Sequence, residues 1–156
     1  MPTKKADAAE VATLSESFSP EERAAMRQRA AELRAEGKQG AKRADGLEAL
    51  FASIAAMTPQ DRELAEHVHR TVTAVAPGLT PKTYYGMPAY ATEGKDGKVI
   101  GFFKPKSKFK VRYSTVGFQP DARLDDGDMW ATEFAVIKLT PTVESRIAEL
   151  VKKAAG

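Results

Sequence analysis

The sequence predicts an α+β domain, a two-layer sandwich in which helices pack on one antiparallel sheet of about five strands, preceded by an N-terminal helical arm. Three observations support this fold class. Between residues 18 and 76 apolar side chains recur at helical spacing. From Lys82 onward, short segments rich in β-branched and aromatic residues alternate with turn signals. After Thr140 the helical spacing returns.

The length and composition predict one domain with extensions at its N-terminus. The chain has 156 residues, a typical size for a single domain with its own core. Residues 1–17 lack a sustained apolar period and are expected to be a mobile tail. We assign residues 18–46 to a helical arm and a basic linker, and residues 47–156 to the α+β domain.

Capping signals predict where the helices begin. We expect N-caps at Ser19, Asp45, Thr58 and Thr140. The first helix should run to about Glu36, and its narrow apolar stripe suits an appended arm. Residues 37–46 contain three glycines and three basic residues, which should interrupt the helical pattern before the second helix. The second and third helices should cover one sheet.

Five segments have the composition of strands, and tight turns between them favour an antiparallel meander. The predicted strands are residues 82–85, 89–92, 98–104, 109–115 and 133–138. The turn at residues 94–97 should join the second and third strands as a hairpin. Pro88 argues against continuous pairing between the first two strands, since proline has no N–H to donate.

Composition excludes several functional classes. The chain has no cysteine, so disulfides, thiolate metal sites and cysteine nucleophiles are excluded. A net charge of +3, from 24 basic and 21 acidic residues, falls short of the excess expected of a dedicated nucleic-acid binder. No secretory signal, membrane span or catalytic motif is recognisable. We therefore expect a soluble, cytoplasmic and non-enzymatic binding protein without catalytic residues.

Four ordered segments resemble the YdhG-like domain family. They are Tyr85-Gly86-Met87-Pro88-Ala89-Tyr90, Gly117-Phe118, the stretch from Leu124 to Thr132, and Leu150-Val151-Lys152-Lys153-Ala154. Ala131 stands where family members often have proline. The resemblance implies a frataxin-like fold and, because some members are described as intracellular iron chaperones, weak iron binding and delivery to an acceptor protein. Frataxin-type iron binding depends on a surface of carboxylates, so the resemblance itself transfers no ligand.

An acidic segment supplies candidate iron ligands. Four aspartates lie within eight residues of one another, at positions 121, 125, 126 and 128. Carboxylate oxygens suit hard cations, and we take Asp125, Asp126 and Asp128 as the candidate ligands. The alternative is a solvated turn in which the aspartates cap local amides. His67 and His69 lie about 200° apart around a helix and cannot share one metal ion.

A basic segment suggests a second hypothesis, an adaptor for an anionic partner. Lys108, Lys110 and Arg112 alternate with apolar residues, so on a strand their side chains would share one face. Such a face could hold a nucleic acid, a phosphate or an acidic protein by electrostatic attraction. The alternative is a solvated basic edge that maintains solubility.

A third hypothesis is a small-molecule pocket among aromatic residues. The segment from Val99 to Phe103 is apolar on both strand faces, as expected for a central strand. Tyr85, Tyr90 and Trp130 could line a pocket beside it, because their rings are apolar and their tips are polar. The alternative is core packing of these aromatics. Weak iron binding is the leading hypothesis, and the other two are its rivals.

Overall fold

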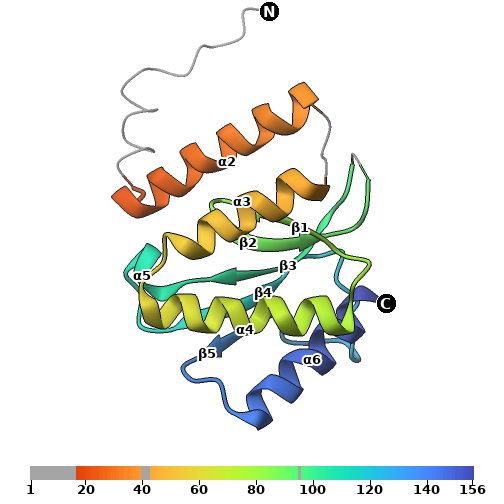
Figure 1. Cartoon of the computed structure of the whole chain (residues 1–156). Coiled ribbons are helices and arrows are strands. Elements are labelled where there is room, and N and C mark those ends of the chain that lie inside the picture. The colour runs from red at the N-terminus through yellow and green to blue at the C-terminus, as the bar shows by residue number, and fades with distance from the viewer. Residues whose placement is uncertain (1–16, 40–42, 95) are drawn as a thin grey trace, which may run out of the picture.

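A computed structural model describes residues 17–39, 43–94 and 96–156 of the chain, with side chains outside 37–39 and 43. It confirms the α+β class, because helices pack on a single antiparallel sheet and an N-terminal helix precedes them (Figure 1). The predicted tail lies almost wholly outside the described residues, and so do residues 40–42 of the predicted linker and Lys95 of the predicted hairpin turn.

The sheet is a meander in which every strand pairs with the next one along the chain. Its strands are β1 (Thr80–Tyr84), β2 (Met87–Ala91), β3 (Val99–Lys104), β4 (Ser114–Phe118) and β5 (Glu133–Val136). They lie in the order β1-β2-β3-β4-β5, and all neighbours are antiparallel. The predicted topology is therefore confirmed, with β3 at the centre of the sheet.

Three helices cover one face of this sheet. They are α3 (Arg43–Ala55), α4 (Pro59–Val75) and α6 (Pro141–Ala155), and Figure 1 shows them in front of the strands. Leu50 of α3, Val68 of α4 and Ile147 of α6 are buried in one cluster with Phe103 of β3. The main core therefore lies between the sheet and these helices, and the second and third predicted helices do cover the sheet.

Three of the four predicted caps are confirmed. Ser19 and Glu22 bond each other's backbone N–H groups at the start of α2 (Pro20–Gln39). Thr58 accepts from the N–H of Asp61, and Thr140 accepts from the N–H of Val143 at 3.2 Å. The prediction for Asp45 is wrong, because α3 already begins at Arg43 and Asp45 lies within its first turn. There its charge complements the positive end of the helix dipole.

The described part of residues 37–46, where a break was predicted, is helical. Helix α2 continues through Gly37 to Gln39, and α3 begins at Arg43. Three glycines in this segment suggested an interruption, but a glycine lowers helix stability by only about 1 kcal/mol relative to alanine. Packing can offset a penalty of that size, so the helices extend into the predicted linker.

The fourth predicted strand, residues 109–115, is misplaced. Residues Lys106–Phe109 form a short helix, α5, and Lys110 ends it in the left-handed conformation with φ 52°. Strand β4 begins only at Ser114. The fully buried Asp61 of α4 accepts a hydrogen bond from the N–H of Ser107 at 3.1 Å, and this long-range contact favours the helical turn.

Pro88 does not interrupt the first hairpin. It lies in β2 opposite Thr83, next to a two-residue turn formed by Tyr85 and Gly86. Hydrogen-bonded and non-bonded pairs alternate in an antiparallel ladder, so this position needs no N–H toward β1. Pairing with β3 starts one residue later, at Ala89. The missing donor is therefore not required on either side.

The second face of the sheet is covered much less than the first. Met87, Ala89 and Phe102 form a small buried cluster there, which Tyr84, Tyr85 and Phe109 partly cover. We call this side the open face. Helix α2 packs against β1 and α5, and Figure 1 shows it outermost in the molecule, beyond α3. Within the described ranges, no helix is both long and apolar enough to cross a membrane.

Candidate functional site

A groove separates the N-terminal half of α2 from the open face. Its volume is about 430 Å³. One wall carries Phe18, which lies just before α2, and Met26 of α2. The other wall carries Met87, Phe102 and Phe109, which belong to β2, β3 and α5. We call this cavity the open-face groove, and its lining is largely apolar.

The position of Phe102 in the groove follows from the alternation of side chains along β3 and from Gly117 on β4. Phe102 lies opposite Gly117 across the β3–β4 ladder, and both belong to the open face. A Cβ atom at Gly117 would overlap the Phe102 ring, so the ring lies directly over the backbone of β4. Side chains alternate between faces along a strand, and Ala89, opposite Phe102 on β2, therefore also contributes to the open face.

The charged side chains of the groove are one inner, half-buried cation, Lys104, and two exposed carboxylates, Glu22 and Glu133. The Nζ atom of Lys104 lies 4.9 Å from the centre of the Phe109 ring, and in the described part of the chain it makes no ion pair. Glu22 accepts a hydrogen bond from the backbone of Ser19, and Glu133 is exposed on β5. The half-buried charge available to a bound molecule is therefore positive.

Helix α2 is held in place by polar contacts of four of its side chains, which we call the clasp. Lys110 Nζ lies 2.8 Å from Glu21 Oε1, and Lys108 Nζ donates to Gln28 Oε1 at 2.6 Å. Glu32 accepts from the N–H groups of Tyr85 and Gly86, and Lys82 forms an ion pair with Glu36. The clasp therefore joins α2 to β1, to the β1–β2 turn and to the segment around α5.

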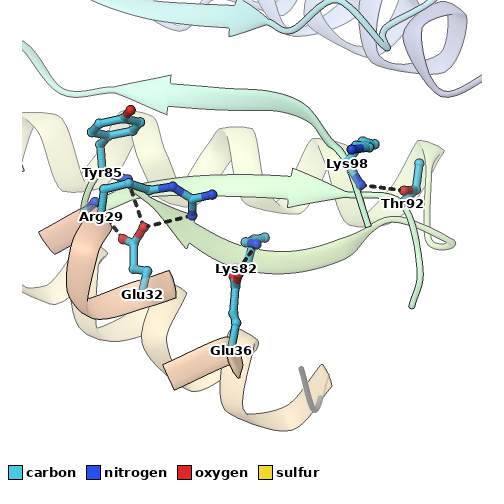
Figure 2. Close-up of polar contacts among 8 residues, drawn as sticks. Arg29, Glu32, Glu36, Lys82, Tyr85, Thr92 and Lys98 are labelled. Carbon is cyan, nitrogen blue, oxygen red and sulfur yellow. Dashed lines mark hydrogen bonds and ion pairs between the residues drawn. The ribbon is translucent and has the colours of Figure 1, made fainter. Parts of the chain in front are cut away.

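Among the four α2 side chains of the clasp, Glu32 accepts the most hydrogen bonds. Its two oxygens accept from the N–H of Tyr85 at 3.1 Å and of Gly86 at 2.9 Å (Figure 2). Both donors have left-handed backbone angles, φ 54° and 77°. Successive N–H groups in such turns form a concave anion-binding nest. Arg29 pairs with the same carboxylate at 3.4 Å, and its guanidinium lies 4.9 Å from the centre of the Tyr84 ring.

The attraction between Glu21 and Lys110 of the clasp favours the charged form of each side chain. The hydrogen bond from Lys110 lowers the pKa of Glu21, and Glu21 in turn raises the pKa of Lys110. Burial lowers the pKa of Lys108, against the opposing effect of Glu32. Both partners of the Glu21–Lys110 pair are solvent-accessible, so salt will screen their attraction.

Apolar packing contributes little to the position of α2. Among residues 20–36, whose side chains are described, only Ala25 is buried. Met26 and Leu33 remain 37% and 52% exposed. A second cavity, of about 600 Å³, lies between α2 and α3. Helix α2 thus has an open space on each side, and the polar clasp carries much of its attachment.

The three residues predicted to bind anions do not share a strand face. Lys108 belongs to α5, Lys110 is its left-handed cap, and Arg112 follows in the loop before β4. Arg112 places its guanidinium 5.1 Å from the Tyr113 ring centre. The strand-face prediction is wrong because the segment is not a strand. Two of the three residues nevertheless contact glutamate or glutamine side chains of the chain's own α2.

The aromatic residues predicted to form a pocket are separated. Tyr85 lines the open-face groove. Tyr90 is on the helix-covered face, where it is 3% exposed and its hydroxyl lies 3.0 Å from His69 Nδ1. Burial raises the pKa of Tyr90 and lowers that of His69. Trp130 is 40% exposed in the loop between β4 and β5 and lines neither the open-face groove nor the cavity between α2 and α3.

Of the groove residues, only Tyr85 was assigned to a pocket from the sequence, and Met26, Phe102 and Lys104 are among those that were missed. A signal was present for Phe102, because a central strand that is apolar on both faces requires cover on both faces. The spacing of Tyr85 and Tyr90 was also informative. They are five residues apart, and an odd separation favours opposite faces of a strand.

The acidic loop is anchored at its start and exposed beyond it. Leu124 is buried in the main core, and the N–H of Arg123 donates to the carbonyl of Ala154 at 3.1 Å. Asp125, Asp126 and Asp128 follow as exposed residues. In the part of the chain that the structure describes, no group of three or more His, Cys, Asp or Glu side chains is arranged to hold a metal ion. Iron binding by this loop stays a prediction.

An anaerobic calorimetric titration with ferrous iron tests that prediction. If the loop binds iron, the wild-type chain should release binding heat, and a variant with Asp126→Asn and Asp128→Asn should lose it, since amides are weaker ligands than carboxylates for a hard cation. The control is Asp96→Asn, which removes an exposed carboxylate elsewhere. Equal heats from the wild-type chain and the double variant would eliminate the loop as an iron site.

Comparisons of the chain with protein-family models, with curated proteins and with solved structures found no match. The resemblance to the YdhG-like family and the frataxin-like label consequently stay predictions from the sequence. The α+β fold and the groove rest on the structure itself.

Proposed function

We propose that this chain is a non-enzymatic binding protein that takes a small carboxylic acid with an apolar body into the open-face groove. The observation that carries the proposal is the position of Lys104. This half-buried cation stands beside the Phe109 ring in a groove otherwise lined mainly by apolar side chains. A ligand's hydrocarbon part would contact Met26, Met87 and Phe102, and its carboxylate would pair with Lys104.

The groove has a suitable size for such a ligand. Sites for small molecules typically have volumes of roughly 300–1,000 Å³ and combine apolar walls with a few polar groups. Each buried CH₂ group contributes about 0.8 kcal/mol, so the CH₂ groups of an eight-carbon acid contribute roughly 5 kcal/mol when all are buried. Part of this gain is offset by the loss of free motion on binding. We therefore expect affinities in the micromolar range or weaker for a simple aliphatic acid.

Nuclear magnetic resonance titration of the full ¹⁵N-labelled chain tests the proposal with two probes, octanoate and octylamine. Octanoate should shift the amide signals of Phe102, Lys104 and Phe109, and octylamine should do so at higher concentration, because the inner charge is positive. Lys104→Gln should weaken octanoate binding by about tenfold, in line with the loss of one charge-assisted hydrogen bond.

Two matched substitutions on α2 locate the binding site. Met26→Trp places a larger side chain in the groove and should abolish the octanoate shifts. Leu33→Trp makes the same kind of change on the same helix, at a residue that is 52% exposed and does not line the groove, and should leave binding intact. Octanoate binding that survives Met26→Trp, or that equals octylamine binding, would refute the proposal.

A further inference from the structure

The contacts of the clasp lie along one stripe of α2. Glu21, Gln28, Glu32 and Glu36 are separated by seven, four and four residues. At about 100° per residue, these positions fall within roughly 80° around the helix axis. Three carboxylates and one amide oxygen therefore point toward the same neighbouring surface. All of their partners are N–H or ammonium donors.

The receiving surface is built without any contribution from α2. The nest at Tyr85 and Gly86 is the turn of the β1–β2 hairpin, whose flanking residues Tyr84 and Met87 pair across the ladder. Lys82 is fixed on β1, and Lys108 and Lys110 are placed by α5. Turn geometry and strand pairing orient these donors, so the surface is preorganised for carboxylates.

Helix α2 is attached in a way that allows another helix to take its place on this surface. Its contacts are mainly polar, its side chains are largely exposed, and cavities lie on both of its sides. Figure 2 shows Glu32 and Glu36 reaching from α2 to the hairpin. The surface recognises oxygen atoms at helical spacing, a pattern that another helix with a stripe of carboxylates can present equally well.

We propose that the Tyr85–Gly86 turn, together with Lys82, Lys108 and Lys110, is a docking surface for an acidic helix of a partner protein, and that α2 occupies this surface in cis. Charge complementarity identifies the partner's chemistry: carboxylates on one helical stripe, one of which enters the backbone nest. Tyr85 also lines the open-face groove and α2 forms one of its walls, but the contacts of the clasp support this inference whatever the groove binds.

The experiment uses the full chain and a fluorescent peptide with the sequence of residues 18–39 as the probe. The variant Glu32→Lys, Glu36→Lys should release α2 from the surface, because like charges replace attractive contacts at the nest and at Lys82. The peptide should bind this variant at least tenfold more tightly than it binds the wild-type chain, where tethered α2 competes at high effective concentration. The binding should weaken as salt is added.

Two controls separate docking from general electrostatic attraction. A peptide carrying Glu32→Gln and Glu36→Gln should bind the variant at least tenfold more weakly than the unchanged peptide. The full-chain variant Glu63→Lys, Glu149→Lys makes the same charge change at exposed residues that belong to α4 and α6, and should bind the peptide no better than the wild-type chain. Circular dichroism establishes that each variant is folded.

Three results would overturn the proposal. In the first, the folded Glu32→Lys, Glu36→Lys variant (the clasp variant) does not bind the peptide, which would make α2 a permanent part of the domain. In the second, the clasp variant and the control variant Glu63→Lys, Glu149→Lys bind the peptide equally well. The third is a stable wild-type dimer in sedimentation that dissociates when Glu32 and Glu36 are replaced, since the occupant would then be α2 of a second copy.

Discussion

Replacing Phe103 by alanine should lower the free energy of unfolding by about 3–5 kcal/mol, the largest effect expected for a single substitution in this chain. The side chain is completely buried at the centre of the sheet. It lies in the main core with residues of α3, α4 and α6. A sheet on one side and packed helices on the other cannot collapse fully into the space left behind, so a cavity penalty adds to the lost burial.

Chemical denaturation of the full chain measures this effect. The matched control is Phe51→Ala on α3, where the phenyl ring is 50% exposed and packs edge-on against His69. Half of its surface is already in water, so we expect a loss of only about 1 kcal/mol. Similar losses at the two positions would show that the helix-covered side of the sheet is not the main source of stability.

Gly86→Ala should both strain the first hairpin and loosen α2. Gly86 has a φ of +77°, and an L-residue in the left-handed region costs about 1–2 kcal/mol. A Cβ atom at this position would also overlap the side-chain amide of Gln28. Gln28 would have to move, and its hydrogen bond to Lys108 would be lost. We therefore expect lower global stability together with faster amide exchange in α2.

Gly127→Ala is the control, because it imposes similar strain without a neighbour. Gly127 has a φ of +67°, and its Cβ would meet no atom within 4 Å. Denaturation should show a comparable loss of stability, whereas hydrogen exchange by mass spectrometry should show α2 protected as in the wild-type chain. Unchanged exchange of α2 in Gly86→Ala would contradict the role given to the clasp.

Much of the fold could be predicted because its signals are local. The caps at Ser19, Thr58 and Thr140 involve residues three positions apart, and the structure contains all three. The β2–β3 hairpin follows from a glycine-containing turn between two short strand segments. Asp45 shows the limit of such signals, because the same residue suits a cap or a first helical turn.

The candidate site could be predicted only in part. Tyr85 was selected from the sequence and does line the groove, and Lys108 and Lys110 were selected and do contact carboxyl or amide oxygens. The prediction that Lys108 and Lys110 lie on one strand was wrong. The buried carboxylate of Asp61 in α4 accepts a hydrogen bond from the N–H of Ser107, and this contact favours a helical turn. Local alternation of basic and apolar residues could not reveal a partner 46 positions away.

The sequence by itself determined the α+β class, the starts of three helices and the order of the meander, since capping, periodicity and turn chemistry act within a few residues. Only the tertiary structure decided where the proposed binding surfaces lie. Glu32 meets Gly86 across 54 positions and Gln28 meets Lys108 across 80. Such contacts depend on how separate elements pack, and the same packing creates the groove between α2 and the open face.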